Sequence, residues 1–287
     1  MRNLTLREEL VRAARFLNGR GVSSPGLDAE VLLAHVLGRD RVYLYRESQR
    51  YLDGEAARRY RALLKRRAGG EPVAYLTGRK EFMGLDFIVG PPVLIPRPET
   101  ELLVENALAA LAGSPGHPAV VDVGTGSGAV AVSLARLASR CAVYATDISA
   151  EALMLARENA ARHGVAVEFF HGDLLSPLRG VLEPGSVAVI TANLPYIPKE
   201  ELSSLPREVR DYEPRTALDG GFDGLEPYRR LVPVAAQYLA PGGMLLMEIS
   251  PDQAERALAL ALPPRWESAP VPDLAGRTRL VKARLKQ

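Results

Sequence analysis

The sequence is poor in cysteine and aromatic residues and has no strong excess of charge. With one cysteine, Cys141, in 287 residues, the chain cannot form an internal disulfide, which fits a reducing compartment. Its 36 basic and 34 acidic residues give a formal net charge of +2, so charge alone predicts no nucleic-acid partner. No Cys/His cluster has the spacing of metal ligands, and we therefore expect no metal site.

Long apolar runs are also missing. Residues 1–10 are charged and lack the apolar core of a signal peptide, and no later run is long enough to span a bilayer. We therefore expect a cytoplasmic chain without a membrane partner. A hydrophobic content of 47% over this length suffices for one large domain and a small one.

The first part of the chain, residues 1–78, predicts a small all-α bundle. Leu6, Leu10, Ala13 and Leu17 recur at helical spacing before glycines that end the segment. Further helices are expected over residues 27–37 and 54–67, each followed by glycine. Three short helices around one small core form a bundle, to which pattern alone assigns no function.

Residues 79–98 have a different residue pattern from that of the predicted bundle. Apolar residues around Gly84 and Gly90 predict a short hairpin, and prolines at 91, 92, 96 and 98 then hold the backbone extended. We expect a hairpin and a proline-rich linker here, with the next helix beginning at Glu99.

Beyond the linker, residues 99–287 alternate apolar strands with amphipathic helices. This order is typical of an α/β fold with a mostly parallel seven-stranded sheet covered on both faces, as in a Rossmann-like domain. The expected strands are 119–123, 142–146, 165–170, 187–191, 244–249, 267–271 and 280–284, and the expected helices are 127–138, 150–163, 226–239 and 253–262.

A glycine-rich loop, Gly124-Thr125-Gly126-Ser127-Gly128, follows the first large strand and opens a helix. Its glycines permit a tight turn and a close approach to a ligand, and the helix N-terminus offers free amide donors. With Ala129 the loop also satisfies the dinucleotide-binding pattern, so a nicotinamide cofactor stays open at this point.

Two acidic residues after the next strands favour an adenosine cofactor. Asp147 ends its strand where a carboxylate accepts the ribose hydroxyls, and Ile148 follows it beside the cofactor; helix capping is left to Ser149. Asp173 is placed to accept the adenine amino group, and Leu174 to cover the ring. This second position favours S-adenosyl-L-methionine over a nicotinamide.

The segment Asn193-Leu194-Pro195-Tyr196 follows a buried strand and suits a planar nitrogen acceptor. The Asn193 side-chain oxygen and the Leu194 carbonyl each accept one amide hydrogen, which orients the nitrogen toward a sulfonium methyl. Pro195 keeps Leu194 out of the helical region, and Tyr196 supplies a flat wall. We interpret these four residues as catalytic, with Asn193 also contacting the cofactor, and predict nitrogen methylation.

Further short motifs are spread over nearly the whole chain. They are Leu94-Ile95-Pro96-Arg97-Pro98-Glu99-Thr100-Glu101, Glu213-Pro214, Ala217-Leu218, Gly224-Leu225, Glu248-Ile249 and Asp273-Leu274-Ala275-Gly276. Together with the glycine loop and the Asn193 segment, this set resembles the HemK/PrmC family of protein-(glutamine-N5) methyltransferases. The Pro-Arg-Pro-Glu-Thr-Glu element is the most specific part of the resemblance.

The resemblance implies a helical domain that grips class 1 peptide chain release factors and a class I methyltransferase domain that modifies the Gln of their Gly-Gly-Gln motif. Arg97 and Glu99 would lie on a loop that closes over the site. Where the family usually has Asn-Pro-Pro-Tyr, this chain has Leu194, which keeps the backbone carbonyl but not the fixed φ of proline. The strand before it also lacks the usual Asp.

Three other functions compete with this reading. A glutamine methyltransferase acting on a ribosomal protein would share the motifs. An adenine-N6 nucleic-acid methyltransferase would use the same Asn-x-Pro-Tyr, but such enzymes usually carry a basic groove, which the near-neutral charge disfavours. A nicotinamide oxidoreductase would need a catalytic Tyr-x-x-x-Lys or a His-carboxylate pair, and the sequence shows no such set.

Overall fold

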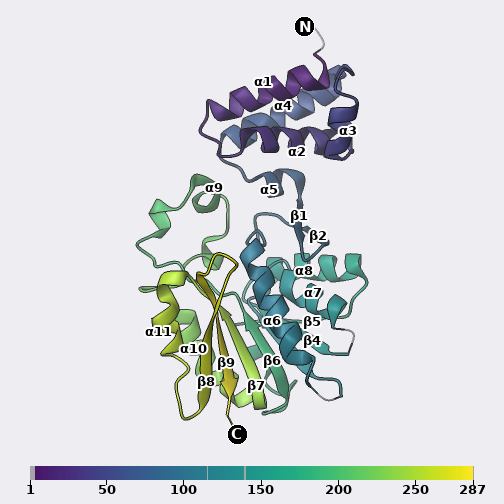
Figure 1. Cartoon of the computed structure of the whole chain (residues 1–287). Coiled ribbons are helices and arrows are strands. Elements are labelled where there is room, and N and C mark those ends of the chain that lie inside the picture. Colours follow the sequence, from purple (N-terminus) through teal and green to yellow (C-terminus); the bar gives the residue numbers. More distant parts are fainter. Residues whose placement is uncertain (1–3, 115, 139, 287) are drawn as a thin grey trace. The chain divides into compact units, whose positions relative to one another are not determined.

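The computed structural model describes residues 4–114, 116–138 and 140–286. The chain forms two compact units, shown in Figure 1 in colours that follow the sequence. The first comprises Met1–Arg79 and Pro206–Tyr212, and the second comprises Lys80–Leu205 and Glu213–Gln287. Of residues 79–98, predicted above as a hairpin and linker, all but Arg79 belong to the second unit.

The first unit is a helical bundle. A capping box at Thr5 begins its first helix, and Asp53 caps the fourth. Its core contains fully buried Leu17, Leu32 and Tyr60, and the Tyr60 hydroxyl donates to the Ala29 carbonyl at 2.9 Å. The helices are α1 (Leu6–Asn18), α2 (Pro25–Leu37), α3 (Arg41–Arg46), α4 (Gly54–Ala68) and α5 (Val73–Thr77).

The three predicted helices of this bundle are confirmed, but α3 and α5 were not predicted. They have six and five residues, fewer than two turns, so neither is long enough to show a helical period.

A distant part of the chain, Pro206–Tyr212 with the short helix α9 (Arg207–Arg210), packs within this first unit. Buried Arg67 pairs with Asp28 at 2.6 Å and with Glu208 at 2.8 Å. The Tyr212 hydroxyl donates to the Gly69 carbonyl at 3.1 Å. These contacts join residues far apart in the sequence, which no local pattern reveals.

The second unit contains the predicted seven-stranded sheet. Its strand order is β5-β4-β3-β6-β7-β9-β8, and only the pairs that involve β9 are antiparallel. Helices α6, α7 and α8 lie on one side of the sheet and α10 and α11 on the other (Figure 1). The strands are β3 (Ala119–Val123), β4 (Ala142–Asp147), β5 (Glu168–His171), β6 (Val187–Ala192), β7 (Leu239–Glu248), β8 (Trp266–Pro272) and β9 (Thr278–Leu285). The other elements are the hairpin β1 (Arg79–Phe82) and β2 (Leu85–Ile88), and the helices α6 (Glu101–Leu111), α7 (Ala129–Leu137), α8 (Ala150–His163), α10 (Glu226–Tyr238) and α11 (Ala254–Leu258).

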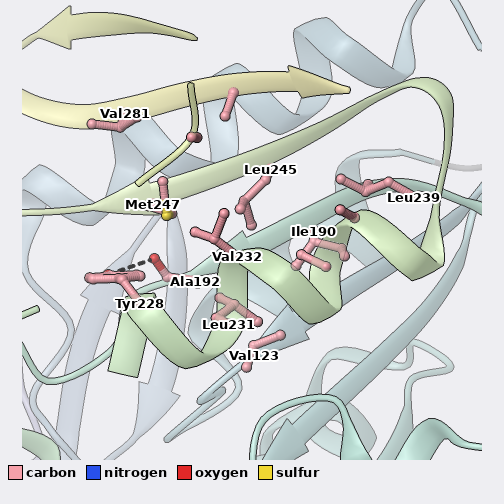
Figure 2. Close-up of a cluster of buried hydrophobic side chains, with 14 of the residues drawn as sticks. Val123, Ile190, Ala192, Tyr228, Leu231, Val232, Leu239, Leu245, Met247 and Val281 are labelled. Carbon is pink, nitrogen blue, oxygen red and sulfur yellow. Dashed lines mark hydrogen bonds between the residues drawn. The ribbon is translucent and has the colours of Figure 1, made fainter. Parts of the chain in front are cut away.

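The core of this unit forms where α10 packs on the central strands, as Figure 2 shows. Leu231 and Val232 of α10 lie against Ile190 of β6 and Leu245 of β7, and each of these side chains is at most 3% exposed. Burial of each such side chain stabilises the fold by about 1.5–3 kcal/mol. The core fixes the ends of β6 and β7, from which the site residues extend.

Three element bounds differ from expectation by three residues or more. Strand β5 begins at Glu168 rather than 165, and α11 ends at Leu258, before Pro263-Pro264, rather than at 262. Strand β7 begins at Leu239, because an irregular register lets Leu239 pair with Val187 despite the glycines at 242 and 243. Within the described ranges, no helix has the length and apolarity needed to cross a bilayer.

Candidate active site

A cavity of about 270 Å³ lies in the second unit, beyond the carboxyl ends of β3, β4 and β6. In open α/β sheets this is where ligands bind, beside the strand at which the sheet order reverses. The predicted site residues that line it are Gly124, Thr125, Gly126, Ser127, Asp147, Ile148, Asp173, Leu174, Asn193, Leu194 and Pro195; Gly128 and Tyr196 do not.

The glycine loop turns sharply from β3 into α7. Gly124 has φ +73°, and a Cβ there would lie 2.9 Å from Leu194 Cδ2, so the loop meets the Asn193 segment closely. At Gly128, φ is +79° and a Cβ would lie 3.1 Å from the Ala156 side chain. Gly128 therefore packs α7 against α8 instead of facing the cavity.

Asp147, at the end of β4, holds the glycine loop through a hydrogen bond from Gly126. One carboxylate oxygen accepts the Gly126 amide at 2.8 Å, and the other accepts the Ser149 amide at 2.8 Å. Ser149 caps α8 by accepting from Ala152, as predicted. Burial raises the pKa of Asp147, while these backbone hydrogen bonds lower it. The carboxylate is thus fixed beside the glycine loop.

Thr125 has a structural task that sequence reasoning missed. Its hydroxyl donates to Asp122 at 2.7 Å, and Thr191 of β6 donates to the same carboxylate at 2.8 Å. Burial raises the pKa of Asp122 to about 6, and the two hydroxyls oppose that shift. Asp122 thereby ties the glycine loop to β6.

Asp173 and Leu174 border the cavity after β5. Leu174 has φ +50°, which is uncommon for a residue with a branched side chain. The Asp173 carboxylate is paired with Arg230 of α10, a cavity-lining residue that the sequence did not indicate. Ile148 is 63% exposed at the cavity.

The Asn193 segment is held by fully buried Tyr228 of α10. The Leu194 amide donates to the Tyr228 hydroxyl at 3.1 Å, and that hydroxyl lies 3.2 Å from the Ala192 carbonyl and 2.5 Å from the Glu248 carbonyl. Tyr228 thus joins the ends of β6 and β7. Throughout the described residues, nothing donates to the Leu194 carbonyl oxygen, which leaves that oxygen available as an acceptor.

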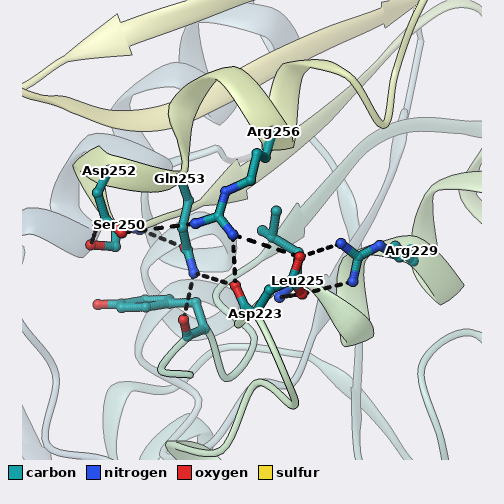
Figure 3. Close-up of polar contacts among 8 residues, drawn as sticks. Asp223, Leu225, Arg229, Ser250, Asp252, Gln253 and Arg256 are labelled. Carbon is teal, nitrogen blue, oxygen red and sulfur yellow. Dashed lines mark hydrogen bonds and ion pairs between the residues drawn. The ribbon is translucent and has the colours of Figure 1, made fainter. Parts of the chain in front are cut away.

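The last residue of this segment, Tyr196, is held by Gln253, which follows β7 in the sequence. Gln253, fully buried, donates to the Tyr196 carbonyl at 2.7 Å. Figure 3 shows it beside Asp223, which pairs with Arg229 and Arg256. Gly224 is required here, because a Cβ at that position would lie 2.2 Å from both Gln253 Nε2 and the Tyr196 carbonyl oxygen.

Tyr196 is absent from the cavity lining, and its partly buried side chain packs against the hydrophobic core. Its role as a flat wall for the acceptor stays a prediction. Burial raises the pKa of Tyr196 to about 12.

The proline-rich segment contributes Arg97 and Thr100 to the cavity lining, whereas Glu99 is outside it. Arg97 pairs with buried Glu213 at 2.5 Å, and the Ile95 amide donates to the same carboxylate at 3.3 Å. Asn193 Nδ2 donates to Thr100 Oγ1 at 3.1 Å, so residues 93 positions apart meet beside the cavity. No group of three or more metal-ligating side chains occurs in the part of the chain that the structure describes.

The fold and this cavity define a class I methyltransferase. A methyltransferase domain model matches residues 120–212, and a model of the PrmC N-terminal domain matches residues 8–78. A solved methyltransferase from Pyrococcus furiosus has the same fold, with a TM-score of 0.51 and 21% identity, over 79% of this chain and 97% of its own.

Sequence relatives identify the family. The chain is 47% identical over 280 residues to the release factor glutamine methyltransferase of Moorella thermoacetica, covering 96% of this chain and 97% of the relative. It is 44% identical to that of Geobacter sulfurreducens, over 89% and 88% of the two chains. The chain therefore belongs to the release factor glutamine methyltransferase family, as the motifs predicted.

Proposed function

We propose that this protein transfers the methyl group of S-adenosyl-L-methionine to the side-chain amide nitrogen of the Gln in the Gly-Gly-Gln motif of class 1 release factors. The observation that carries the proposal is a single cavity in which the glycine loop and Asp147 face Asn193. Nearly full-length identity to release factor glutamine methyltransferases supports the choice of acceptor.

The residues present fit the cofactor. Gly124 and Gly126 bring backbone close to a ligand without side chains, and Asp147 presents a fixed carboxylate. The glycine loop would hold the methionine end, Asp147 the ribose, and Ile148, Asp173 and Leu174 the adenine. When bound, the cofactor supplies an electrophilic methyl group on a sulfonium.

The acceptor amide needs orientation more than activation. Its nitrogen lone pair is delocalised, so the two amide hydrogens must be held while the nitrogen faces the methyl carbon. The Asn193 side-chain oxygen and the Leu194 carbonyl each accept one hydrogen. The bound cofactor would supply its methyl group to this nitrogen, and the proton that the nitrogen then loses would pass to water, so no general base is required.

The helical unit supports a protein acceptor. Its residues 8–78 match a domain specific to this family, and we propose that it helps to bind the release factor. Because the proposed acceptor takes part in translation termination, we propose a cytoplasmic reaction. No direct nucleic-acid contact is part of the proposal.

Transfer of a tritiated methyl group to a purified class 1 release factor tests the proposal. A Gly-Gly-Gln→Gly-Gly-Ala release factor serves as the matched substrate control. We expect label on the first protein and none on the second. Equal labelling of both would place the acceptor elsewhere, and label on a ribosomal protein or nucleic acid alone would replace the proposed acceptor.

A further inference from the structure

A buried carboxylate lies behind the proposed acceptor site. Glu248 ends β7, is 4% exposed and does not line the cavity. Within the described residues it has no ion-pair partner, and its Oε2 atom has no hydrogen-bond partner. Burying such a group costs free energy, so its presence needs a reason other than stability.

The β6–β7 register places this carboxylate beside Asn193. Ala192 pairs with Met247, so the residues that follow them, Asn193 and Glu248, leave adjacent strands together. Thr100 and Asn193 lower the pKa of Glu248 through side-chain hydrogen bonding, which places both side chains next to its carboxylate. The three side chains form one connected network.

The direction of each hydrogen bond follows from the donors available. Asn193 Nδ2 donates to Thr100 Oγ1 at 3.1 Å. An ionised carboxylate only accepts, so the Thr100 hydroxyl hydrogen and the second Nδ2 hydrogen of Asn193 are the hydrogens that these neighbours can offer to Glu248. With the Nδ2 group directed toward Thr100 and Glu248, the Asn193 side-chain oxygen is left for another donor.

We propose that Glu248, together with Thr100, is a positioning residue that holds the Asn193 carboxamide with its oxygen toward the acceptor amide. A flipped carboxamide would place that oxygen against the Glu248 carboxylate, where two acceptors repel. The inference rests on the proposed function, because it assigns the Asn193 oxygen to the substrate amide.

Charged and titratable groups on every neighbouring element act on Glu248. Burial raises its pKa to about 7; Glu99 before α6 raises it further, and Arg279 of β9 lowers it. Tyr196 and Tyr228 also face it, and both are neutral below pH 10 because burial raises their pKa values. Ionised Glu248 only accepts hydrogen bonds; once protonated it carries an O–H that competes for the same partners.

Four variants test the proposal in the full-length protein. Glu248→Leu removes both acceptor oxygens, Glu248→Gln keeps the shape and one of them, and Thr100→Val removes the connecting hydroxyl. Ser133→Ala is the matched control, because Ser133 in α7 is fully buried and its hydroxyl has no partner among the described residues. For each variant, kcat on the release factor, KM, the Kd for S-adenosyl-L-methionine and Tm are measured.

We expect kcat to fall about 10–100-fold in Glu248→Leu and about tenfold in Thr100→Val, with the cofactor Kd within about twofold of wild type. Glu248→Gln should lose about five- to tenfold in kcat while its Tm stays at or above that of wild type. Ser133→Ala should keep its kcat within about twofold.

A kcat equal to that of wild type in both Glu248→Gln and Thr100→Val would overturn the inference. A lower kcat in Glu248→Gln that is accompanied by a lower Tm would overturn it as well, because lost stability would then explain the loss of activity. The proposed function is tested separately by the wild-type protein. If wild type labels the release factor and the variants do too, only the inference fails. If wild type labels nothing, both fail.

Discussion

The two sides of the cavity are built in different ways. The cofactor side consists of a tight turn and the residues that end neighbouring strands, where the Gly126 amide donates to the Asp147 carboxylate. The acceptor side is assembled from side chains distant in sequence, where Tyr228, Gln253 and Thr100 each hold one part of the Asn193 segment. Binding of the cofactor and orientation of the acceptor should therefore be separable by mutation.

The largest expected effect is on the acceptor side. Asn193→Ala removes one of the two groups proposed to hold the acceptor amide, and we expect kcat to fall roughly 10²–10³-fold. The Kd for S-adenosyl-L-methionine, measured by calorimetry, should change by less than about threefold. Near-normal turnover by this variant would contradict the assignment of Asn193.

The reciprocal change is on the cofactor side. Asp147→Asn keeps the shape of the side chain but replaces one carboxylate oxygen by an NH2 group. This group cannot accept a hydrogen bond, whether from the Gly126 amide or from a ribose hydroxyl. We expect the cofactor Kd to rise about 10–100-fold, with kcat at saturating cofactor within about threefold. An unchanged Kd would remove Asp147 from the proposed cofactor site.

A change of pH should affect the acceptor side through Glu248. Because burial raises the pKa of this carboxyl to about 7, kcat should fall below that pH and level off about five- to tenfold lower, as in Glu248→Gln, once the protonated carboxyl no longer only accepts hydrogen bonds. The same profile in Glu248→Gln should be flat near pH 7. An identical fall in both proteins would assign the titration to another group.

The effect on stability has the opposite sign. A folded-state pKa raised above the ordinary carboxyl value of 4.5 favours the neutral form, so this group's contribution to the free energy of unfolding declines as pH rises from about 4.5 to about 7. Glu248→Gln removes that decline. Thermal unfolding of both proteins at pH 5 and pH 8 should show the variant gaining relative stability at pH 8.

The smallest expected effect concerns the exposed pair of Asp173 and Arg230. Arg230→Ala frees the Asp173 carboxylate, and because an exposed pair contributes little energy, the cofactor Kd should change by less than about threefold. Asp173→Ala should weaken cofactor binding more than Arg230→Ala if Asp173 contacts the adenine. Equal effects would assign both residues only to the surface pair.

Local motifs explain why much of the cofactor side was predictable. The glycine loop, Asp147 and the strand-helix alternation depend on neighbouring residues in the sequence, and the structure places the loop and the carboxylate together as expected. Even there, the Thr125 hydroxyl and Gly128 have packing tasks, because their partners Asp122 and Ala156 are set by the fold.

The acceptor side was predictable only in its central motif. Nothing near Asn193 in the sequence indicates that Thr100 and Glu248 lie beside it, since the contact depends on the β6–β7 register and on the entry of α6. The packing of Tyr196 against the hydrophobic core likewise depends on the fold and not on the motif.

The most direct test of the separation between the two sides is to measure kcat and the cofactor Kd side by side in Asn193→Ala and Asp147→Asn, with the release factor as substrate. Our account predicts a crossed result: Asn193→Ala loses kcat and keeps cofactor affinity, and Asp147→Asn loses affinity and keeps most of its kcat. Parallel losses of both quantities in both variants would contradict it.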